Sequence, residues 1–405
     1  EESMRLWKEM QAGTELGLTC CVRAKMDPAS DNGTLRDPTT YRCNVGTPHN
    51  LTGTKYKVYP TYDFACPWVD AHEGVTHALR DRQYVDRDEQ YKRMAELQGV
   101  RCTAIWSFSR INFKQCLLSK RKLNWFVETG RVSGWDDPRM PTMQGILRRG
   151  MSVDGLRTFI LLQGASQSIN LMEWDKIWAE NRKAIDPLAA RYTAVTSAYS
   201  VPVRLRSEVA GEVPAQPEAR SLLKHKKNPE LGTKLKWFSD AVMIEGEDAA
   251  LIADNEEITL MDWGNAVVER IERDASGRVT MIDARLNLAG DVKKTKKKLT
   301  WVAAGAENVA VELVDLDHLV NKDSLEEEDE LKDGAPFINE CTMERHPAIG
   351  EPALRTLKRS QIVQIERRGF YICDAPYIRP SDPVVLFFVP DGKNMFGHRK
   401  PQKAA

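Results

Sequence analysis

The hydrophobic positions of the chain recur at helical spacing in six separated segments. These are 4–10, 86–97, 124–128, 142–149, 153–162 and 171–185. In 86–97, for example, Tyr91, Met94 and Ala95 share one helical face. A glycine or proline follows most of these segments, as Gly150 follows 142–149, and such residues end helices. The pattern predicts helices over all six segments.

Short apolar runs at 58–64 and 103–106 flank the helix predicted at 86–97 and predict strands. Strand, helix and strand in this order imply a parallel βαβ unit, and open sheets of this kind bind ligands at the carboxyl ends of their strands. Tyr62 lies at the end of the first run, and Arg110 follows the second. These residues are therefore candidates for a binding site.

From residue 193 onward the pattern changes to short apolar runs separated by turns, which predicts strands. The runs are 201–206, 235–244, 257–261, 266–272, 278–286, 299–302, 361–365, 370–373 and 384–389. Asp274 to Gly277 has the composition of a hairpin turn. We therefore expect an all-β region that forms one or two barrels.

The chain has 405 residues, which predicts two to four domains, and its 58 basic and 58 acidic side chains give a formal net charge of zero. Because the chain has no overall positive field, contact with a nucleic acid would have to use local basic runs, such as 224–227 and 293–298. The run 323–333 is acidic. Each run alone is more often a solvated face, but a barrel with basic loops is a common way to hold a polynucleotide.

Eight cysteines are present without a C-x-x-C pair. Cys20, Cys21 and Cys43 could supply three zinc ligands, but adjacent cysteines have the wrong spacing and no histidine lies near them. We expect reduced thiols in a cytoplasmic protein and no structural metal. No apolar run has the length of a membrane span and no signal peptide is present, so we expect no membrane contact.

The stretch 117–123 places a hydroxyl, at Ser119, beside three consecutive cations, Lys120, Arg121 and Lys122. Like charges side by side repel each other unless they face solvent or a polyanion. Taken alone, this stretch fits both a solvated basic turn and an anion-binding loop.

Five segments occur in a fixed order along the first 150 residues: YPTYDFACP (59–67), EGVTHALR (73–80), LSKRKL (118–123), GWDDPR (134–139) and LRRG (147–150). Together they resemble the class I aminoacyl-tRNA synthetases for glutamate and glutamine, most closely the glutamyl-tRNA synthetases of the eukaryotic and archaeal cytosolic type. The resemblance continues through NLMEWDKIW (170–178), KNPE (227–230), WGN (263–265) and GFY (369–371), so it covers nearly the whole chain.

The resemblance implies a multidomain protein with a partial Rossmann-like α/β catalytic domain, a helical stem-contact region and C-terminal all-β anticodon-binding barrels. The implied domains are the end of an acceptor-stem-binding insertion at 1–56, the second half of the Rossmann domain at 57–123, the helical region at 124–192 and two β-barrels at 193–405, with the distal barrel near 255–335.

One family motif, an ATP signature of the His-x-Gly-His type near the start of the Rossmann domain, has no match. His346 precedes a Pro-Ala-Ile-Gly run but lies in the β region. We therefore expect the first half of the Rossmann domain to lie upstream of Glu1. The first residues of the sequence have the pattern of the middle of a helix, which agrees with this expectation. The chain alone is expected to bind tRNA in a salt-sensitive way but to fail ATP–pyrophosphate exchange.

The activity that the resemblance implies is that of a glutamate–tRNA ligase. Glutamate attacks the α-phosphate of ATP, which enters with Mg²⁺, and the glutamyl group then passes to the terminal adenosine of tRNA(Glu). Ser119 and Lys120 match the catalytic KMSKS-type loop of the family, in which the lysine stabilises the leaving pyrophosphate. ATP contact is implied for Asp81, Arg110, Ile111, Leu118, Ser119 and Lys120.

Glutamate contact is implied for Tyr62 and Arg80. A γ-carboxylate needs a fixed bidentate cation, which arginine supplies, whereas glutamine would leave that cation unpaired. Glutaminyl relatives resemble one another in having a small uncharged residue at the position of Arg80. They also have Thr-His at the two positions where this chain has Ala65 and Cys66. A glutaminyl-tRNA synthetase and a non-catalytic tRNA-binding or scaffold module are the alternatives.

The partners that the resemblance implies are tRNA(Glu), L-glutamate and ATP. It also implies a cytoplasmic location and contact with a multi-synthetase complex through a missing N-terminal region.

Overall fold

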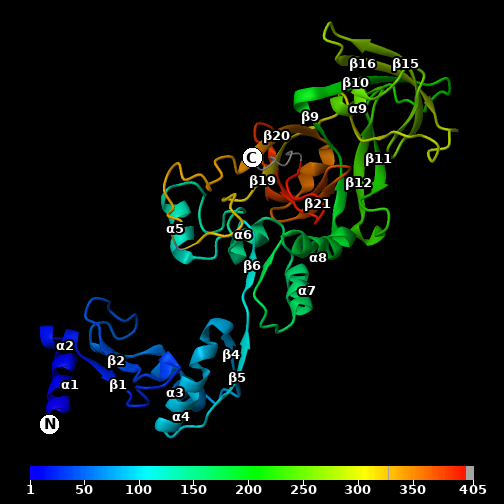
Figure 1. Ribbon diagram of the computed structural model, residues 1–405. Helices are drawn as coiled ribbons and strands as arrows, with labels where there is room; N and C mark the ends of the chain where they lie inside the picture. The colour runs from blue at the N-terminus through cyan, green and yellow to red at the C-terminus, as the bar shows by residue number, and fades with distance from the viewer. Residues whose placement is uncertain (327, 398–405) are drawn as a thin grey trace. The chain divides into compact units, whose positions relative to one another are not determined.

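The structure, a computed structural model, describes residues 1–326 and 328–397, and the chain folds into two units (Figure 1). Unit 1 contains Glu1–Asn112 and Gln163–Leu171. Unit 2 contains Phe113–Leu162 and the described residues from Met172 onward. The chain therefore runs from unit 1 into unit 2, returns, and then completes unit 2.

Unit 1 begins with two helices and an antiparallel sheet. The elements are α1 (Glu2–Ala12), α2 (Glu15–Thr19), β1 (Cys21–Arg23), β2 (Thr39–Cys43) and β3 (Val58–Pro60), and the strands pair in the order β1-β2-β3. The strand expected at 58–64 ends at Pro60, because Ala65 N–H donates to the carbonyl of Thr61 and α3 (Tyr62–His72) begins there. Tyr62 is therefore a helical residue.

The predicted parallel βαβ unit is present, but its first strand differs from the expected one. The elements are β4 (His77–Asp81), the 3-10 helix η2 (Arg82–Arg87), α4 (Asp88–Leu97) and β5 (Ala104–Phe108). β4 and β5 pair in parallel, with Arg80 opposite Ser107 and Leu79 opposite Trp106. Arg80 and Ser107 are buried, whereas Leu79 and Trp106 are 68% and 51% exposed. Because successive side chains of a strand point to opposite faces, one face of this pair is buried and the other is open.

Short elements connect this part of the chain to the barrels. They are β6 (Ile111–Phe113), α5 (Lys120–Glu128), α6 (Met143–Arg148), α7 (Val153–Gln163), β7 (Asn170–Met172) and α8 (Asp175–Ile185). Gly155 N–H donates to Ser152 Oγ at 3.0 Å, so Ser152 caps α7. The helix expected at 124–128 already begins at Lys120, and the helix expected at 171–185 begins only at Asp175, because Asn170–Met172 pairs with β6 as a strand.

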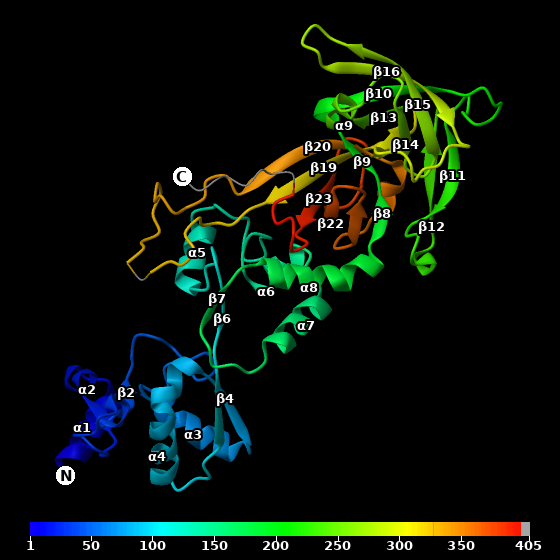
Figure 2. The ribbon, with the colours of Figure 1, turned by 45° about the vertical axis from the view of Figure 1, so that its right-hand side comes forward.

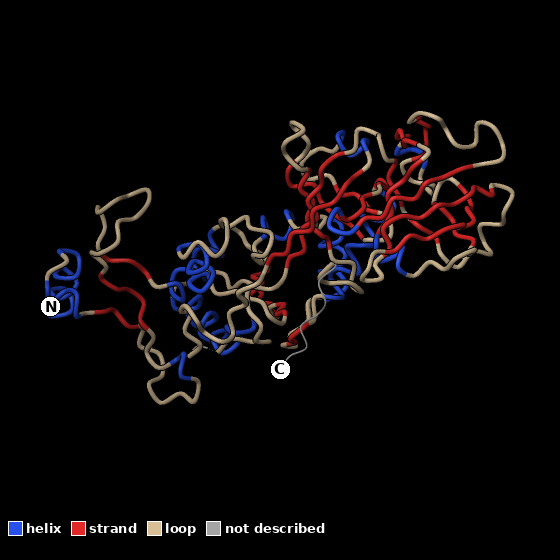
Figure 3. Tube along the Cα trace, turned by 90° about the horizontal axis from the view of Figure 1, so that it is seen from above, coloured by secondary structure: helices blue, strands red, loops and turns tan. Residues whose placement is uncertain are grey.

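The rest of the chain is all β, as predicted, and Figure 3 shows the strands, in red, gathered in this part. The order of the first seven-stranded sheet is β17-β14-β15-β16-β10-β13-β18, and that of the second is β8-β21-β22-β23-β19-β20-β9. The bounds are β8 (Ala190–Tyr192), β9 (Ala194–Thr196), β10 (Ser200–Arg206), β11 (Glu218–Leu223), β12 (Thr233–Phe238), β13 (Ala241–Glu245), α9 (Gly246–Ala250), β14 (Glu257–Leu260), β15 (Gly264–Arg273), β16 (Val279–Asn287), β17 (Lys298–Leu299), β18 (Trp301–Ala303), β19 (Val309–Leu316), β20 (Met343–Gly350), β21 (Ile362–Ile365), β22 (Gly369–Ala375) and β23 (Val384–Val389).

Each of the two sheets curves into a barrel-like form around its own apolar core. Trp301 and Val203 lie in the first core, and Tyr371 and Leu386 lie in the second. β11 and β12 form a separate antiparallel pair. The single strand expected at 235–244 is therefore two strands, β12 and β13, which belong to different sheets.

A long excursion, residues 317–342, joins β19 to β20 and lies beside α5 (Figure 2). Apolar residues from both segments share one buried cluster, which includes Leu117, Leu123 and Phe126 on one side and Leu319, Val320 and Ile338 on the other. The acidic run 323–333 belongs to this excursion, so the barrel region supplies part of the surroundings of α5.

Candidate active site

Arg80 is a buried cation with few partners. It lies on β4 and is only 7% exposed. Its Nη1 donates to Asp88 Oδ1 at 3.3 Å, and its Nε is buried without an acceptor among the described residues. The guanidinium carbon lies 5.2 Å and 5.4 Å from the ring centres of Tyr84 and Tyr91. The rings fix the plane of the guanidinium, and part of its donor capacity stays unused.

Tyr62 opens α3 and is 59% exposed. Its ring centre lies 6.0 Å from that of Tyr84, which also packs on Arg80. An interaction between the Tyr62 hydroxyl and the Cys66 thiol, together with partial burial, raises the pKa of Tyr62. The structure thus brings Tyr62 and Arg80, both predicted from sequence, to the same tyrosine ring, that of Tyr84.

Asp81 and Arg110, two residues predicted to contact ATP, form an ion pair with each other through Arg110 Nε. Asp81 ends β4 and also accepts from Gln83 N–H at 3.0 Å, which caps η2. The Gln83 N–H and then the Arg110 guanidinium lower the pKa of Asp81, and burial opposes them. Ile111 follows as the first residue of β6 and is half-buried. These three residues therefore lie next to one another in the structure.

The basic stretch after Leu117 is the exposed start of a helix. Leu118, Ser119, Lys120 and Arg121 are all exposed, and Lys120 is the first residue of α5. The Lys120 ammonium has no hydrogen-bonding or ionic partner in the described part of the chain. Cations in a first helical turn face the positive end of the helix dipole, which is unfavourable unless an anion binds there. Because these cations are exposed, they can meet either solvent or an anion such as a phosphate.

The base of this stretch is fixed by the β19–β20 excursion. Gln115 N–H donates to the Asp323 carbonyl at 3.0 Å, and Lys114 Nζ pairs with the Asp323 carboxylate at 3.0 Å. Lys122 Nζ donates to the Glu326 carbonyl at 2.7 Å. Lys122 is thus engaged within the chain. Asp323 and Glu326 lie about 200 residues away in the sequence, and no sequence motif predicts these contacts.

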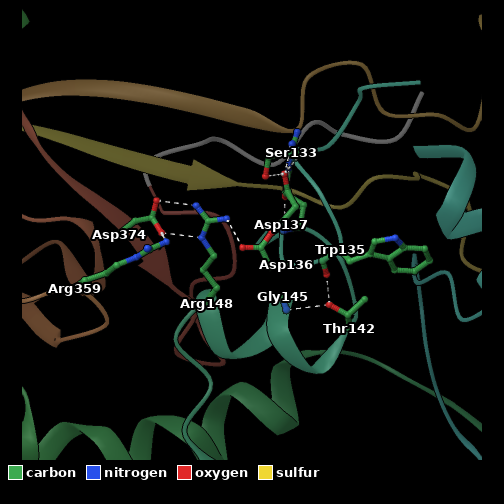
Figure 4. A network of polar contacts seen from close by, with 10 residues as sticks. Ser133, Trp135, Asp136, Asp137, Thr142, Gly145, Arg148, Arg359 and Asp374 are labelled. Atoms are coloured by element: carbon green, nitrogen blue, oxygen red, sulfur yellow. Dashed lines mark hydrogen bonds and ion pairs between the residues drawn. The ribbon is translucent and has the colours of Figure 1, made fainter. Parts of the chain in front are cut away.

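The segment GWDDPR forms a polar network with α6 and β22 (Figure 4). Asp137 is buried and accepts from Ser133 N–H at 2.9 Å and from the Arg139 guanidinium. Burial alone would raise the pKa of Asp137, but these hydrogen bonds hold it at about 2. Arg148 donates two bonds to Asp374, at 2.8 and 2.9 Å. The segments matched by the family motifs are therefore tied to the second barrel-like sheet.

Among the described residues, no group of three or more His, Cys, Asp or Glu side chains is arranged to hold a metal ion, and Cys20, Cys21 and Cys43 are free thiols. Within the same residues, no helix has the length and apolar character needed to span a bilayer.

The predicted site residues fall into both units. Tyr62, Arg80, Asp81 and Arg110 belong to unit 1, and Leu118, Ser119 and Lys120 belong to unit 2.

Comparison with protein families gives three successive matches. The catalytic domain of class I tRNA synthetases (E and Q) matches residues 1–187, and anticodon-binding domains of the same synthetases match residues 189–287 and 298–374. The architecture is thus a catalytic domain followed by two anticodon-binding domains.

Individual relatives agree with this. The chain is 48% identical over 393 residues to the cytoplasmic glutamate–tRNA ligase of Arabidopsis thaliana and 47% identical over 405 residues to that of Saccharomyces cerevisiae. These alignments cover 97% and 99% of the chain but 53% and 55% of the relatives, so the chain spans about half their length. The bifunctional glutamate/proline–tRNA ligase of Mus musculus is 46% identical over 400 residues, which are 97% of the chain and 26% of that protein.

Matches to one family that follow each other from residue 1 to residue 374 show that the chain belongs to the class I tRNA synthetases for glutamate and glutamine.

Proposed function

We propose that the protein is a glutamate–tRNA ligase, which activates L-glutamate with ATP and transfers it to tRNA(Glu). The family includes synthetases for two amino acids, and the state of Arg80 supports glutamate. Its buried guanidinium makes one long bond, to Asp88, and keeps Nε without an acceptor in the described residues. A buried donor without an acceptor is costly, so this group is prepared for an incoming carboxylate.

The γ-carboxylate of glutamate would meet that need, because arginine can donate two parallel hydrogen bonds to a carboxylate. Glutamine carries a neutral amide at the same place, so it would bring no carboxylate to the buried Arg80 guanidinium, whose ion pair with Asp88 is long at 3.3 Å, and the amide NH₂ would face other donors. Tyr62, whose ring lies beside that of Tyr84, would hydrogen-bond the amino acid.

We further propose that Asp81, Arg110 and Ile111 face the nucleotide. In the activation step, a carboxylate oxygen of glutamate attacks the α-phosphorus, the bond to the β-phosphate breaks, and pyrophosphate leaves. The exposed and unpaired Lys120 ammonium at the start of α5 would neutralise the charge that develops on the leaving group, with Ser119 and Leu118 completing the loop. Mg²⁺ would enter with ATP.

The anticodon-binding domains support tRNA(Glu) as the partner. Several relatives are named as cytoplasmic enzymes, and we propose the same compartment for this protein. The bifunctional relatives join a glutamate and a proline ligase in one protein, which supports assembly with other synthetases as a further proposal.

Substitution of Arg80 tests the glutamate assignment. In the full-length protein, Arg80→Ala should raise KM for glutamate in tRNA charging by about 100-fold, because two charge-assisted hydrogen bonds are worth about 3 kcal/mol. KM for ATP should stay within about twofold of wild type. The matched control is Arg93→Ala, since Arg93 is an exposed arginine of the same unit and its ion pair is with Glu89 on the same helix.

Two results would count against the assignment. An Arg80→Ala variant with unchanged KM for glutamate would remove Arg80 from the pocket, even if the protein charges tRNA with glutamate. A wild-type protein that charges glutamine in preference to glutamate would instead be a glutaminyl-tRNA synthetase.

A further inference from the structure

One face of α3 carries a line of polar side chains that leads away from the proposed amino-acid pocket. Tyr62, Cys66 and Asp70 are spaced four residues apart and so lie on the same side of the helix. An interaction between the Tyr62 hydroxyl and the Cys66 thiol raises the pKa of Tyr62, and the thiol donates to Asp70 Oδ2 at 3.5 Å. Asp70 therefore acts on Tyr62 through one intervening side chain.

The same carboxylate oxygen has a second connection. Tyr91 Oη, from α4, donates to Asp70 Oδ2 at 2.8 Å. The Tyr91 side chain is 3% exposed, and its ring lies 5.4 Å from the guanidinium carbon of Arg80. Burial first, and then the bond to Asp70, raise the pKa of Tyr91, so its hydroxyl keeps the proton that it donates. Through Tyr91, Asp70 also reaches Arg80.

Asp70 is thus linked to both residues that would hold the substrate, to Tyr62 through the Cys66 thiol and to Arg80 through the Tyr91 ring, which packs on the guanidinium. The arm through Cys66 ends on the Tyr62 hydroxyl, and the arm through Tyr91 ends on the face of the Arg80 guanidinium. A buried tyrosine hydroxyl needs an acceptor in any protein. Packing alone, however, does not require that one carboxylate oxygen serve both arms.

We propose that Asp70 and Tyr91 are positioning residues for the glutamate pocket, with Cys66 as the link to Tyr62. This proposal rests on the proposed function. Asp70 fixes the thiol as a donor towards itself, which leaves the sulfur to accept from Tyr62. It also fixes the ring of Tyr91, on which the Arg80 guanidinium lies. Neither residue touches the substrate; both set the direction in which Tyr62 and Arg80 present their hydrogen bonds.

Tyr91→Phe is the central test, because it keeps the ring against Arg80 and removes only the hydroxyl that binds Asp70. In the full-length protein we expect KM for glutamate to rise about fivefold to tenfold, the effect of one lost hydrogen bond, with KM for ATP and for tRNA unchanged. Asp70→Ala, which removes the acceptor for both arms, should give a larger rise. Tyr56→Phe, at an exposed tyrosine of the same unit, is the matched control.

The link is tested by a conservative pair at Cys66. Cys66→Ser keeps a group that can accept from Tyr62 and donate to Asp70, whereas Cys66→Ala breaks the line. Cys66→Ser should therefore retain a KM for glutamate near that of wild type, and Cys66→Ala should show the rise. If Cys66 had a purely structural role, the two variants would have the same KM for glutamate whenever their thermal stabilities are equal.

The proposal fails if the wild-type protein charges glutamate and Tyr91→Phe and Cys66→Ala both keep its KM for glutamate. It also fails if KM for glutamate, ATP and tRNA rise together with a loss of thermal stability, because that is general unfolding. A wild-type protein that does not charge glutamate contradicts the proposed function itself, and the two failures are thereby distinguished.

Discussion

His318 is a buried imidazole that lies close to a buried cation. It follows β19, and its ring centre lies 6.1 Å from that of Trp174 and 5.7 Å from that of Phe396. Burial first and the Arg149 guanidinium second lower the pKa of His318 from its ordinary 6.5 to about 4, against the opposing charge of Asp317. The folded protein therefore keeps this side chain neutral at a pH where an unfolded chain would protonate it.

This difference predicts a loss of stability in mild acid. Because the unfolded state binds the proton first, the free energy of unfolding should fall as pH decreases from 6.5 to about 4, at a slope approaching about 1.4 kcal/mol per pH unit for this group. Urea unfolding of His318→Gln at several pH values should show a shallower slope in this range.

Asp137, another buried titratable group, does not contribute to this slope between pH 6.5 and 4. The pKa of Asp137 is held at about 2, so its protonation affects stability only below its ordinary value of 3.8. If His318→Gln and wild type lose stability in parallel between pH 6.5 and 4, His318 is not the group responsible.

At the scale of single residues, motif spacing predicts the candidate site residues but not the hydrogen bonds that fix the side chains around them. Tyr62, Arg80 and Lys120 were identified from motifs, and their roles stay predictions. The bonds from Asp70 to Tyr91 and from Lys122 to Glu326 depend on how α3 packs on α4 and how the excursion meets α5. Those contacts join residues about 20 and about 200 positions apart, and a local pattern does not encode them.

Among the elements, β4 and β5 form an unusual pair, since only one face is covered. Parallel sheets in proteins are covered on both faces. Here Leu79 and Trp106 lie exposed on the uncovered face, opposite each other in the pairing. We infer that another segment of the full-length protein packs on this face.

Hydrogen exchange tests this inference at the level of one strand. Peptides that contain Ala104–Phe108 should exchange at least about tenfold more slowly in the full-length protein than in the isolated 405-residue chain, since covering a strand slows its opening. Peptides from Gly369–Ala375, a strand within the core of the second sheet, serve as the control and should not differ. Equal exchange of 104–108 in both proteins would refute the inference.

Element prediction succeeded where periodicity was long and failed where short elements of different type adjoin. The helix around Tyr91 and most of the strands expected in the β region match the structure, but 235–244 and 299–302 each divide into two strands, and the long strands Val309–Leu316 and Met343–Gly350 are not among those expected. The stretch 58–64 instead divides at Thr61 into β3 and α3, and Pro67 inside α3 obscures its helical pattern. The start of α5 at Lys120 was missed because three cations in a first turn are poor helix starters by themselves.

At the scale of the whole molecule, the informative features are the order of the matched domains and the net charge of zero. A catalytic domain and two anticodon-binding domains follow one another, and at a net charge of zero the proposed contact with tRNA would depend on local rather than global charge. The multidomain class and the all-β half could be predicted from the sequence. The interleaving of β8, β9 and β19–β23 in one sheet could not, because it pairs strands that are more than 100 residues apart. The domain boundaries stay predictions.

The central claim is that the protein charges tRNA with glutamate and excludes glutamine by means of Arg80. The most direct measurement is tRNA charging by the wild-type full-length protein with radiolabelled glutamate and, in parallel, radiolabelled glutamine. We predict a kcat/KM for glutamate at least about 1,000-fold above that for glutamine, because glutamine would leave buried donors of the Arg80 guanidinium without an acceptor, a penalty of about 4 kcal/mol. Equal charging of the two amino acids, or a preference for glutamine, would contradict the account.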